Sequence, residues 1–232
     1  MIPKIIHYCW FGGKPLPRNV EMCIKSWREK CLDYEIVLWN ENNYDINCNT
    51  FVRNAYQNKE WAFVSDYARL QIVYENGGIY LDTDVELLKS LNPLLDLNLF
   101  LGRQQSGEIN TGIGFGAAKE NVIIKRMLEE YDNVEFDKKR MLDLSCPFMN
   151  TKAIDKVISN GEFDENSCRI LPPEYMDPLA STQNAKNLLC NDTISIHHYD
   201  ASWASNKQKF KRNIAKIIVQ DRIILIKQIL GK

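Results

Sequence analysis

Gly77-Gly78-Ile79-Tyr80-Leu81-Asp82-Thr83-Asp84 is the most informative stretch of this 232-residue chain. Apolar residues repeat at helical spacing over 61–75, just upstream. The two glycines end that predicted helix, because glycine readily adopts the left-handed conformation of a C-terminal cap. Ile79–Leu81 predicts a brief buried strand that leads directly into Asp82 and Asp84. The stretch therefore places two carboxylates at the open edge of a sheet.

The segments on either side of this stretch predict an α/β fold. A helix over 19–31 lies between strands predicted at 5–10 and 34–39, and this early order of elements is typical of parallel strand pairing. The same patterns predict the remaining strands at 99–102, 112–116 and 193–197, and the remaining helices at 122–131 and 150–159.

The composition is that of a soluble globular protein, with 45% hydrophobic and 25% charged residues and a net charge of −1. This balance excludes a disordered chain and a protein that binds nucleic acid by neutralising phosphates. The seven cysteines form no CxxC pair and indicate neither a disulfide framework nor a zinc knuckle. The start of the chain lacks the apolar core of a secretory signal, and no run approaches the roughly 18 apolar residues of a membrane span. We therefore expect a cytoplasmic location.

The segment 206–232 differs from the rest of the chain. It carries eight basic residues against one acidic residue, a charge of +7, and apolar residues interleave with these charges at helical spacing. Two interpretations of this basic amphipathic helix stay open. It lies on an anionic membrane surface, at the inner face of the cell membrane, or it packs on a globular domain over 1–205.

Asp82 and Asp84 are the candidate centre of the chemistry. Two carboxylates one residue apart can both bind one hard cation such as Mg²⁺ or Mn²⁺, and such an ion neutralises the charge on a departing nucleotide diphosphate. The alternative is a pair of solvated turn carboxylates. Upstream, Asp66 and Arg69 share a helix face and can pair with each other. Beside a diphosphate, Arg69 can hold phosphate or sugar oxygens while Asp66 accepts hydrogen bonds from sugar hydroxyls; elsewhere they would be an ordinary ion pair.

Three motifs in this order resemble glycosyltransferase family 32. They are Ile5-Ile6-His7-Tyr8-Cys9-Trp10-Phe11-Gly12-Gly13, Ala62-x-x-Ser65-Asp66-x-x-Arg69, and the stretch over 77–84. The resemblance covers residues 2–120, and the family includes capsular polysaccharide transferases and yeast-type mannosyltransferases. It implies a GT-A-type catalytic domain over 1–205 with a mixed, mostly parallel central sheet flanked by helices. It also implies a nucleotide-sugar donor, a divalent ion and retention of anomeric configuration.

The resemblance implies roles for individual residues. Trp10 would stack on the nucleotide base and Tyr80 would border the nucleotide. Asp66 and Arg69 would contact the donor sugar or diphosphate. Asp82 would contact ribose, sugar or metal, and Asp84 would be the firmest metal ligand. Without the resemblance, Trp10 is predicted to be a core tryptophan.

The segment His197-His198-Tyr199-Asp200-Ala201-Ser202-Trp203 is expected to complete the site. Transferases of this fold commonly take a metal ligand, often a histidine, from a C-terminal segment of the sheet. Adjacent strand residues point to opposite faces, so we expect only one of the two histidines to bind the ion. His197 is favoured over His198, because its spacing to Ser202-Trp203 resembles the pattern of the family. Ser202 and Trp203 would contact the metal or the β-phosphate; the alternative is a histidine pair that caps a strand end.

The glycine-rich stretch 110–116 is not a phosphate-binding loop, because it lacks the Gly-Lys-Ser/Thr ending. We expect it to form the floor between donor and acceptor, with Asn110 in contact with the sugar. Residues 132–190 match no pattern of the family and are expected to shape the acceptor pocket.

The expected function is metal-dependent retaining transfer of a hexose (of galactose, glucose or N-acetylglucosamine type) from a UDP-sugar to a glycan or lipid-linked saccharide in polysaccharide synthesis. The alternatives are a GDP-mannose-dependent mannosyltransferase and a non-catalytic nucleotide-sugar-binding protein. A haloacid-dehalogenase-like phosphatase is disfavoured, because Glu86 stands where its nucleophile loop has Thr or Val.

Overall fold

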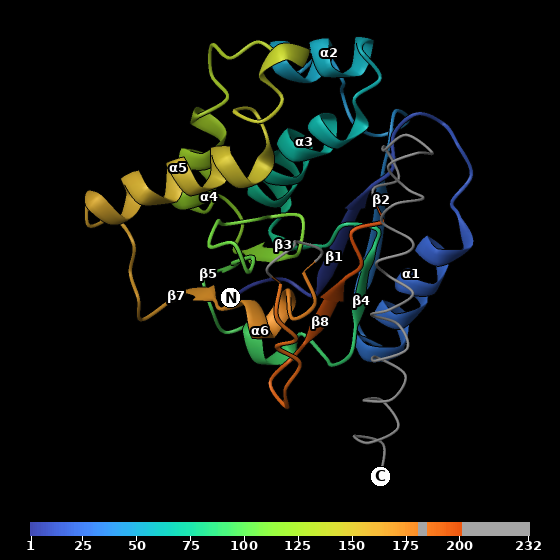
Figure 1. Cartoon of the computed structure of the whole chain (residues 1–232), viewed down its shortest axis with the longest axis vertical. Helices are drawn as coiled ribbons and strands as arrows, with labels where there is room; N and C mark the ends of the chain where they lie inside the picture. The colour runs from blue at the N-terminus through green and yellow to red at the C-terminus, as the bar shows by residue number, and fades with distance from the viewer. Residues whose placement is uncertain (181–184, 201–232) are drawn as a thin grey trace.

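The computed structural model describes residues 1–180 and 185–200 and contains a six-stranded central sheet (Figure 1). The strand order is β2-β1-β3-β6-β5-β7. β1 is parallel to β2 and β3, β5 is parallel to β7, and β6 is antiparallel to both of its neighbours. The predicted mixed, mostly parallel sheet is therefore confirmed. The strand bounds are β1 Ile5–Cys9, β2 Glu35–Trp39, β3 Gly78–Tyr80, β5 Leu99–Gly102, β6 Phe115–Ala117 and β7 Cys168–Leu171.

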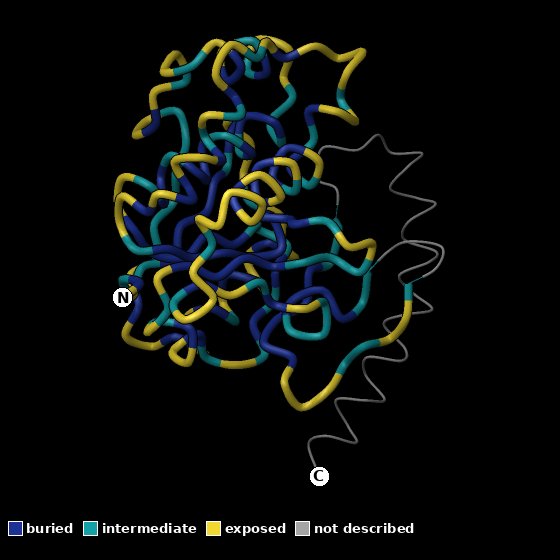
Figure 2. Tube along the Cα trace, turned by 90° about the vertical axis from the view of Figure 1, so that its left-hand side faces the viewer, coloured by how far each residue is buried: buried dark blue, intermediate teal, exposed yellow. Residues whose placement is uncertain are grey.

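Helices cover both faces of the sheet. On one face, α3 (Trp61–Asn76) packs against the sheet. α2 (Thr50–Gln57) and α4 (Val122–Glu129) pack against α3, and α5 (Cys146–Ser159) packs against α4. The other face packs against α1 (Arg18–Lys30) and the short α6 (Pro173–Met176). Two apolar clusters result, one on each side of the strands, and the residues of the central strands β1, β3, β5 and β6 between them are almost all buried (Figure 2). Single turns of 3₁₀ helix occur at Asn92–Leu94 and Lys138–Arg140.

A second, two-stranded sheet connects the middle of the chain to the last described strand. β4 (Val85–Leu87) pairs antiparallel with β8 (Ser195–His197), and Val85 lies opposite His197. The fully buried Trp27 of α1 donates from Nε1 to the Val85 carbonyl at 2.7 Å. This pairing brings His197 next to the turn that follows β3, although 113 residues separate His197 from Asp84.

Most of the predicted elements are present, and two of them begin three or more residues away from the expected position. The strand expected over 112–116 is β6 at Phe115–Ala117, because residues 110–114 form a loop packed against Asp82. The helix expected over 150–159 begins four residues earlier, at Cys146. Four further elements, α2, β4, β7 and α6, have no counterpart among the predicted ones. The predicted helix over 206–232 lies outside the described residues. Within the described residues, none of the helices has the length and apolar character needed to cross a membrane.

Candidate active site

Asp82, Asp84 and His197 form a cluster at the carboxyl edge of the central sheet. The two aspartates lie in the turn between β3 and β4, and His197 ends β8. Each residue offers one ligand atom, and these three atoms lie within 4.8 Å of one another. The side chains of Asp82 and Asp84 are only 27% and 15% exposed. The interpretation as two solvated turn carboxylates is therefore wrong.

Asp84 is the most strongly anchored member of the cluster. Its Oδ1 lies 3.0 Å from His197 Nε2, and its Oδ2 accepts a hydrogen bond from the Asp200 backbone N–H at 2.7 Å. Burial alone would raise the pKa of Asp84, but the His197 charge and these hydrogen bonds hold it well below its usual range. Burial alone would lower the pKa of His197, but the contact with Asp84 raises it above the ordinary histidine value.

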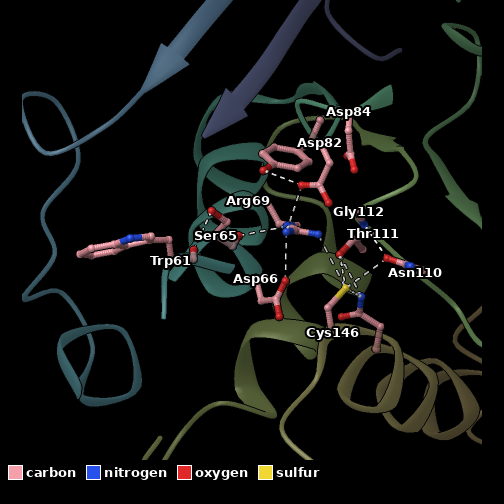
Figure 3. A network of polar contacts seen from close by, with 12 residues as sticks. Trp61, Ser65, Asp66, Arg69, Asp82, Asp84, Asn110, Thr111, Gly112 and Cys146 are labelled. Atoms are coloured by element: carbon pink, nitrogen blue, oxygen red, sulfur yellow. Dashed lines mark hydrogen bonds and ion pairs between the residues drawn. The ribbon is translucent and has the colours of Figure 1, made fainter. Parts of the chain in front are cut away.

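Arg69 connects α3 to the cluster (Figure 3). Its Nη2 lies 3.0 Å from Asp66 Oδ1 and 3.1 Å from Asp82 Oδ1, and its guanidinium carbon lies 4.9 Å from the centre of the Tyr80 ring. The Tyr80 hydroxyl donates to the same Asp82 Oδ1 at 3.1 Å. The Arg69 side chain is only 4% exposed. The Arg69 guanidinium thus binds the carboxylates of both Asp66 and Asp82. It holds Asp82 in place and is not exposed as a hydrogen-bond donor to solvent.

Asp66 lies deeper than the metal-binding candidates. Burial raises its pKa to about 7, although Arg69 and a hydrogen bond from the Cys146 backbone N–H oppose this change. Burial also raises the pKa of Asp82, with Arg69 acting in the opposite direction. The predicted contact of Asp66 and Arg69 with the donor sugar stays a prediction, because both side chains are engaged with each other.

A buried polar floor lies beneath Arg69; it includes residues 110–112, which belong to the floor predicted over 110–116, and Cys146, which was not predicted. Asn110 Oδ1 accepts from the Gly112 backbone N–H at 2.8 Å. Cys146, at the start of α5, lies 3.1 Å from Thr111 Oγ1 and 3.8 Å from Arg69 Nη1 (Figure 3). Ser-Cys-Pro over 145–147 is a helix-start signal, with Ser at the N-cap and Pro in the first turn, and it could have located Cys146 at the start of α5.

The structure separates the two histidines. His198 Nε2 lies 3.0 Å from Glu86 Oε2, outside the cluster, whereas His197 faces Asp84. This is the separation that strand alternation predicts for adjacent residues. His198, predicted as an alternative ligand, is therefore not brought to Asp82 and Asp84 in the described structure.

Trp10 follows β1 at the same edge of the sheet as Asp82, because β1 and β3 are parallel. Its indole N–H donates to the Lys14 carbonyl at 2.6 Å, and its half-buried ring packs on the α1 side of the sheet. Its predicted stacking on a base stays a prediction. Ser202 and Trp203 lie outside the described residues.

The cluster fits a divalent cation. Carboxylate oxygens suit Mg²⁺ and Mn²⁺, and an imidazole nitrogen is a common ligand of transition metals. Asp82 Oδ1 is occupied by Arg69 and Tyr80, and within the described residues no hydrogen bond reaches Asp82 Oδ2, so this oxygen is available to a ligand.

Comparisons with known proteins relate this chain to glycosyltransferases. Residues 17–101, which include Asp82-Thr83-Asp84, match the family model of the glycosyltransferase sugar-binding region containing the DXD motif. The uncharacterized glycosyltransferase L373 of Acanthamoeba polyphaga mimivirus is 22% identical over 97% of this chain and 91% of its own length. Inositol phosphoceramide mannosyltransferase 3 of Schizosaccharomyces pombe is 34% identical over 49% of this chain, and the match spans only 33% of that protein.

The solved structure of PaToxG glycosyltransferase has a TM-score of 0.56 to this chain at 19% identity, covering 68% of this chain and 70% of its own. This likeness confirms the predicted GT-A fold. Together, the sequence and structure matches support a GT-A glycosyltransferase with a DXD motif.

Proposed function

We propose that this chain is a metal-dependent retaining glycosyltransferase that transfers a hexose from a UDP-sugar to a glycan or lipid-linked saccharide. The observation that carries the proposal is the convergence of Asp82, Asp84 and His197 within 4.8 Å, beside the buried Arg69. Mn²⁺ or Mg²⁺ held by these three side chains would neutralise the charge on the departing diphosphate.

The residues around the cluster hold it in one geometry. Arg69 fixes Asp82 through Oδ1 and leaves Oδ2 for a ligand, while the Asp200 backbone fixes Asp84. The preorganised charges then require no rearrangement during the reaction, which is how electrostatic catalysis gains most of its effect. Trp10 and Asn110, with Ser202 and Trp203, are the proposed contacts to the donor, whereas the fully buried Tyr80 supports Asp82 through its hydroxyl.

The retaining course is proposed as a same-face displacement. The bond between the anomeric carbon and the diphosphate oxygen breaks while the acceptor oxygen bonds to that carbon, and the acceptor proton passes to the departing diphosphate. The charge pairing of the site supports this course. Asp66 is held by Arg69 and Asp84 by His197, and the unpaired Oδ2 of Asp82 is assigned to the cation, so none of the three carboxylates is left as a nucleophile.

GDP-mannose is the second candidate donor, because one relative is named as a mannosyltransferase. The name of that relative also includes a ceramide, which supports a lipid-linked acceptor. Such an acceptor would place the enzyme at the cytoplasmic face of a membrane, with the basic segment 206–232 in contact with it. Synthesis of a capsular polysaccharide is the pathway class that the family resemblance suggests.

The test incubates the full chain with Mn²⁺ and each of a panel of UDP-, GDP- and dTDP-sugars, and measures the released nucleotide and the thermal shift. A donor at a hundred times its dissociation constant would stabilise the fold by about 2.7 kcal/mol. We expect turnover with a UDP-hexose and a loss of about 100-fold or more in Asp84→Asn, against no change in the exposed control Asp96→Asn. Binding without turnover would instead favour the non-catalytic alternative, and equal rates in Asp84→Asn and the wild type would refute the assignment.

A further inference from the structure

Over residues 1–180 and 185–200, nothing supplies His197 with the hydrogen bond that usually orients a metal-binding histidine. Its Nε2 faces Asp84 at 3.0 Å, and its Nδ1 is buried without a hydrogen-bond partner within the described residues. Metal-binding histidines almost always donate their second ring N–H to a carboxylate, a carbonyl or water, which fixes the orientation of the ring. In the described part of the chain, a different contact has to hold this ring.

Tyr199 packs directly against the His197 ring. The two ring centroids are 4.0 Å apart with an interplanar angle of 47°. Tyr199 has a φ of +52°, a left-handed conformation that is rare for a large side chain and has to be held by its surroundings. After this turn, the Asp200 backbone N–H reaches Asp84 Oδ2 at 2.7 Å. The left-handed conformation of Tyr199 thus places its ring against His197 and the following backbone N–H against Asp84.

The Tyr199 hydroxyl is anchored by Asp177, a fully buried carboxylate that the proposed reaction does not use. Asp177 Oδ1 accepts from the Tyr199 hydroxyl at 2.8 Å, and Oδ2 accepts from the Gln105 backbone N–H at 2.9 Å. The Gln105 side chain also donates to the Asp177 carbonyl at 3.1 Å. A carboxylate without exposure is costly unless it is well hydrogen-bonded, so these contacts fix Asp177 firmly to the loop after β5.

The loop after β5 reaches the other half of the site as well. Gln104, which precedes Gln105, has its side-chain Oε1 within 3.0 Å of Asn110 Nδ2. Asn110 in turn holds the Gly112 backbone beneath Asp82 and Arg69. The loop that binds Asp177, and through it Tyr199, therefore also contacts the Asn110 floor beneath the site.

We propose that Asp177 and Tyr199 are positioning residues that orient the His197 ring for cation binding. This inference rests on the proposed function, because it assigns His197 to a metal site. The hydroxyl bond holds the tyrosine ring in place, and the tyrosine ring holds the imidazole with Nε2 toward Asp84. Packing against an anchored ring takes the place of a hydrogen bond to Nδ1, which no described residue supplies.

The test measures Mn²⁺ affinity by calorimetric titration of the full chain without donor or acceptor. Loss of an outer residue that orients a metal ligand typically weakens affinity by about 10- to 100-fold. We expect a loss of that size in Asp177→Ala and in Tyr199→Ala, and a smaller loss in Tyr199→Phe, which keeps the ring but not its anchor. The matched control is Tyr34→Phe, which removes a hydroxyl bond to Asn92 Oδ1 at 3.0 Å elsewhere in the fold. It should leave Mn²⁺ affinity unchanged.

Thermal unfolding without metal separates positioning from general damage. Tyr199→Phe and Tyr34→Phe should lose similar stability, while only Tyr199→Phe loses Mn²⁺ affinity. If the wild type and His197→Ala bind Mn²⁺ equally, or neither binds, the metal assignment of the proposed function fails. If His197→Ala loses binding while Asp177→Ala and Tyr199→Ala bind as the wild type does, only the positioning inference is overturned.

Discussion

Gly112 lies where no side chain fits. A Cβ atom at this position would overlap Asp82 Oδ2 and would lie 2.9 Å from Arg69 Nη1 and 3.0 Å from Asn110 Oδ1. Its backbone carbonyl also accepts from the Asp82 N–H at 3.2 Å. The requirement for glycine here is one of space, because the backbone must pass directly beneath the Asp82 carboxylate.

Replacing Gly112 with alanine should displace Asp82 from the cluster. The added methyl group meets the carboxylate oxygen that is available to a ligand, so we expect at least about a 10-fold loss of Mn²⁺ affinity and of transfer activity. Calorimetric titration and nucleotide release measure the two effects. Gly161→Ala is the control, because a Cβ atom there meets nothing within 4 Å, although its φ of +71° makes that variant somewhat less stable. Wild-type affinity in Gly112→Ala would contradict the close packing described here.

Among the elements, those with a strong local signal were predictable. The apolar spacing and terminal glycines locate α3 and β3, and these two elements carry Asp66, Arg69 and the approach to Asp82. The strand β4 has only three residues and no periodic pattern of its own. Its pairing with β8 is a long-range contact, so the position of His197 beside Asp84 was expected only from the family resemblance. The contacts of Cys146 and Asp177 were not predictable, because they depend on how loops distant in sequence pack together.

His7 connects three elements of the sheet through its two ring nitrogens. Nε2 lies 2.9 Å from the Gly77 carbonyl at the end of α3, and Nδ1 lies 3.1 Å from Trp39 Nε1 at the end of β2. The carbonyl can only accept and the indole N–H can only donate, so His7 is neutral with its proton on Nε2. Burial lowers the pKa of His7 and outweighs the Gly77 hydrogen bond and the charge of Glu35, which raise it. Protonation of His7 at Nδ1 would place two N–H donors, His7 Nδ1–H and Trp39 Nε1–H, against each other and break this hydrogen bond.

The free energy of unfolding should therefore fall as the pH drops below about 6.5, the ordinary histidine value. The unfolded chain binds a proton there before the folded chain does, so acid favours unfolding. Urea unfolding between pH 7.5 and 5.5 measures this dependence. His7→Gln cannot titrate, so we expect it to be about 1–3 kcal/mol less stable at neutral pH but to show a shallower decline. Parallel curves for the variant and the wild type would show that His7 does not contribute.

At the scale of the whole molecule, the net charge of −1 conceals an uneven distribution. The segment 206–232 carries +7, which leaves about −8 on the remaining residues. The mostly acidic remainder would be repelled by an anionic membrane, whereas each Lys or Arg near such a surface contributes about 1 kcal/mol of attraction. Contact with a membrane would therefore place the basic segment toward the lipid.

Co-sedimentation of the full chain with anionic vesicles tests this orientation. We expect binding at an ionic strength of about 0.1 M and release near 1 M, because the screening length shortens from about 10 Å to about 3 Å. The first variant replaces Lys207, Lys209 and Lys211 with glutamine and so removes three charges from the basic segment. We expect this variant to bind the vesicles much more weakly than the wild type does. The matched control removes three exposed charges from the remaining residues, in the triple glutamine variant of Lys30, Lys125 and Lys139. Both variants lower the net charge by the same amount. Equal pelleting of the two variants would therefore mean that the basic segment has no special role in binding. The proposed lipid-linked acceptor would then lose its main support from this chain.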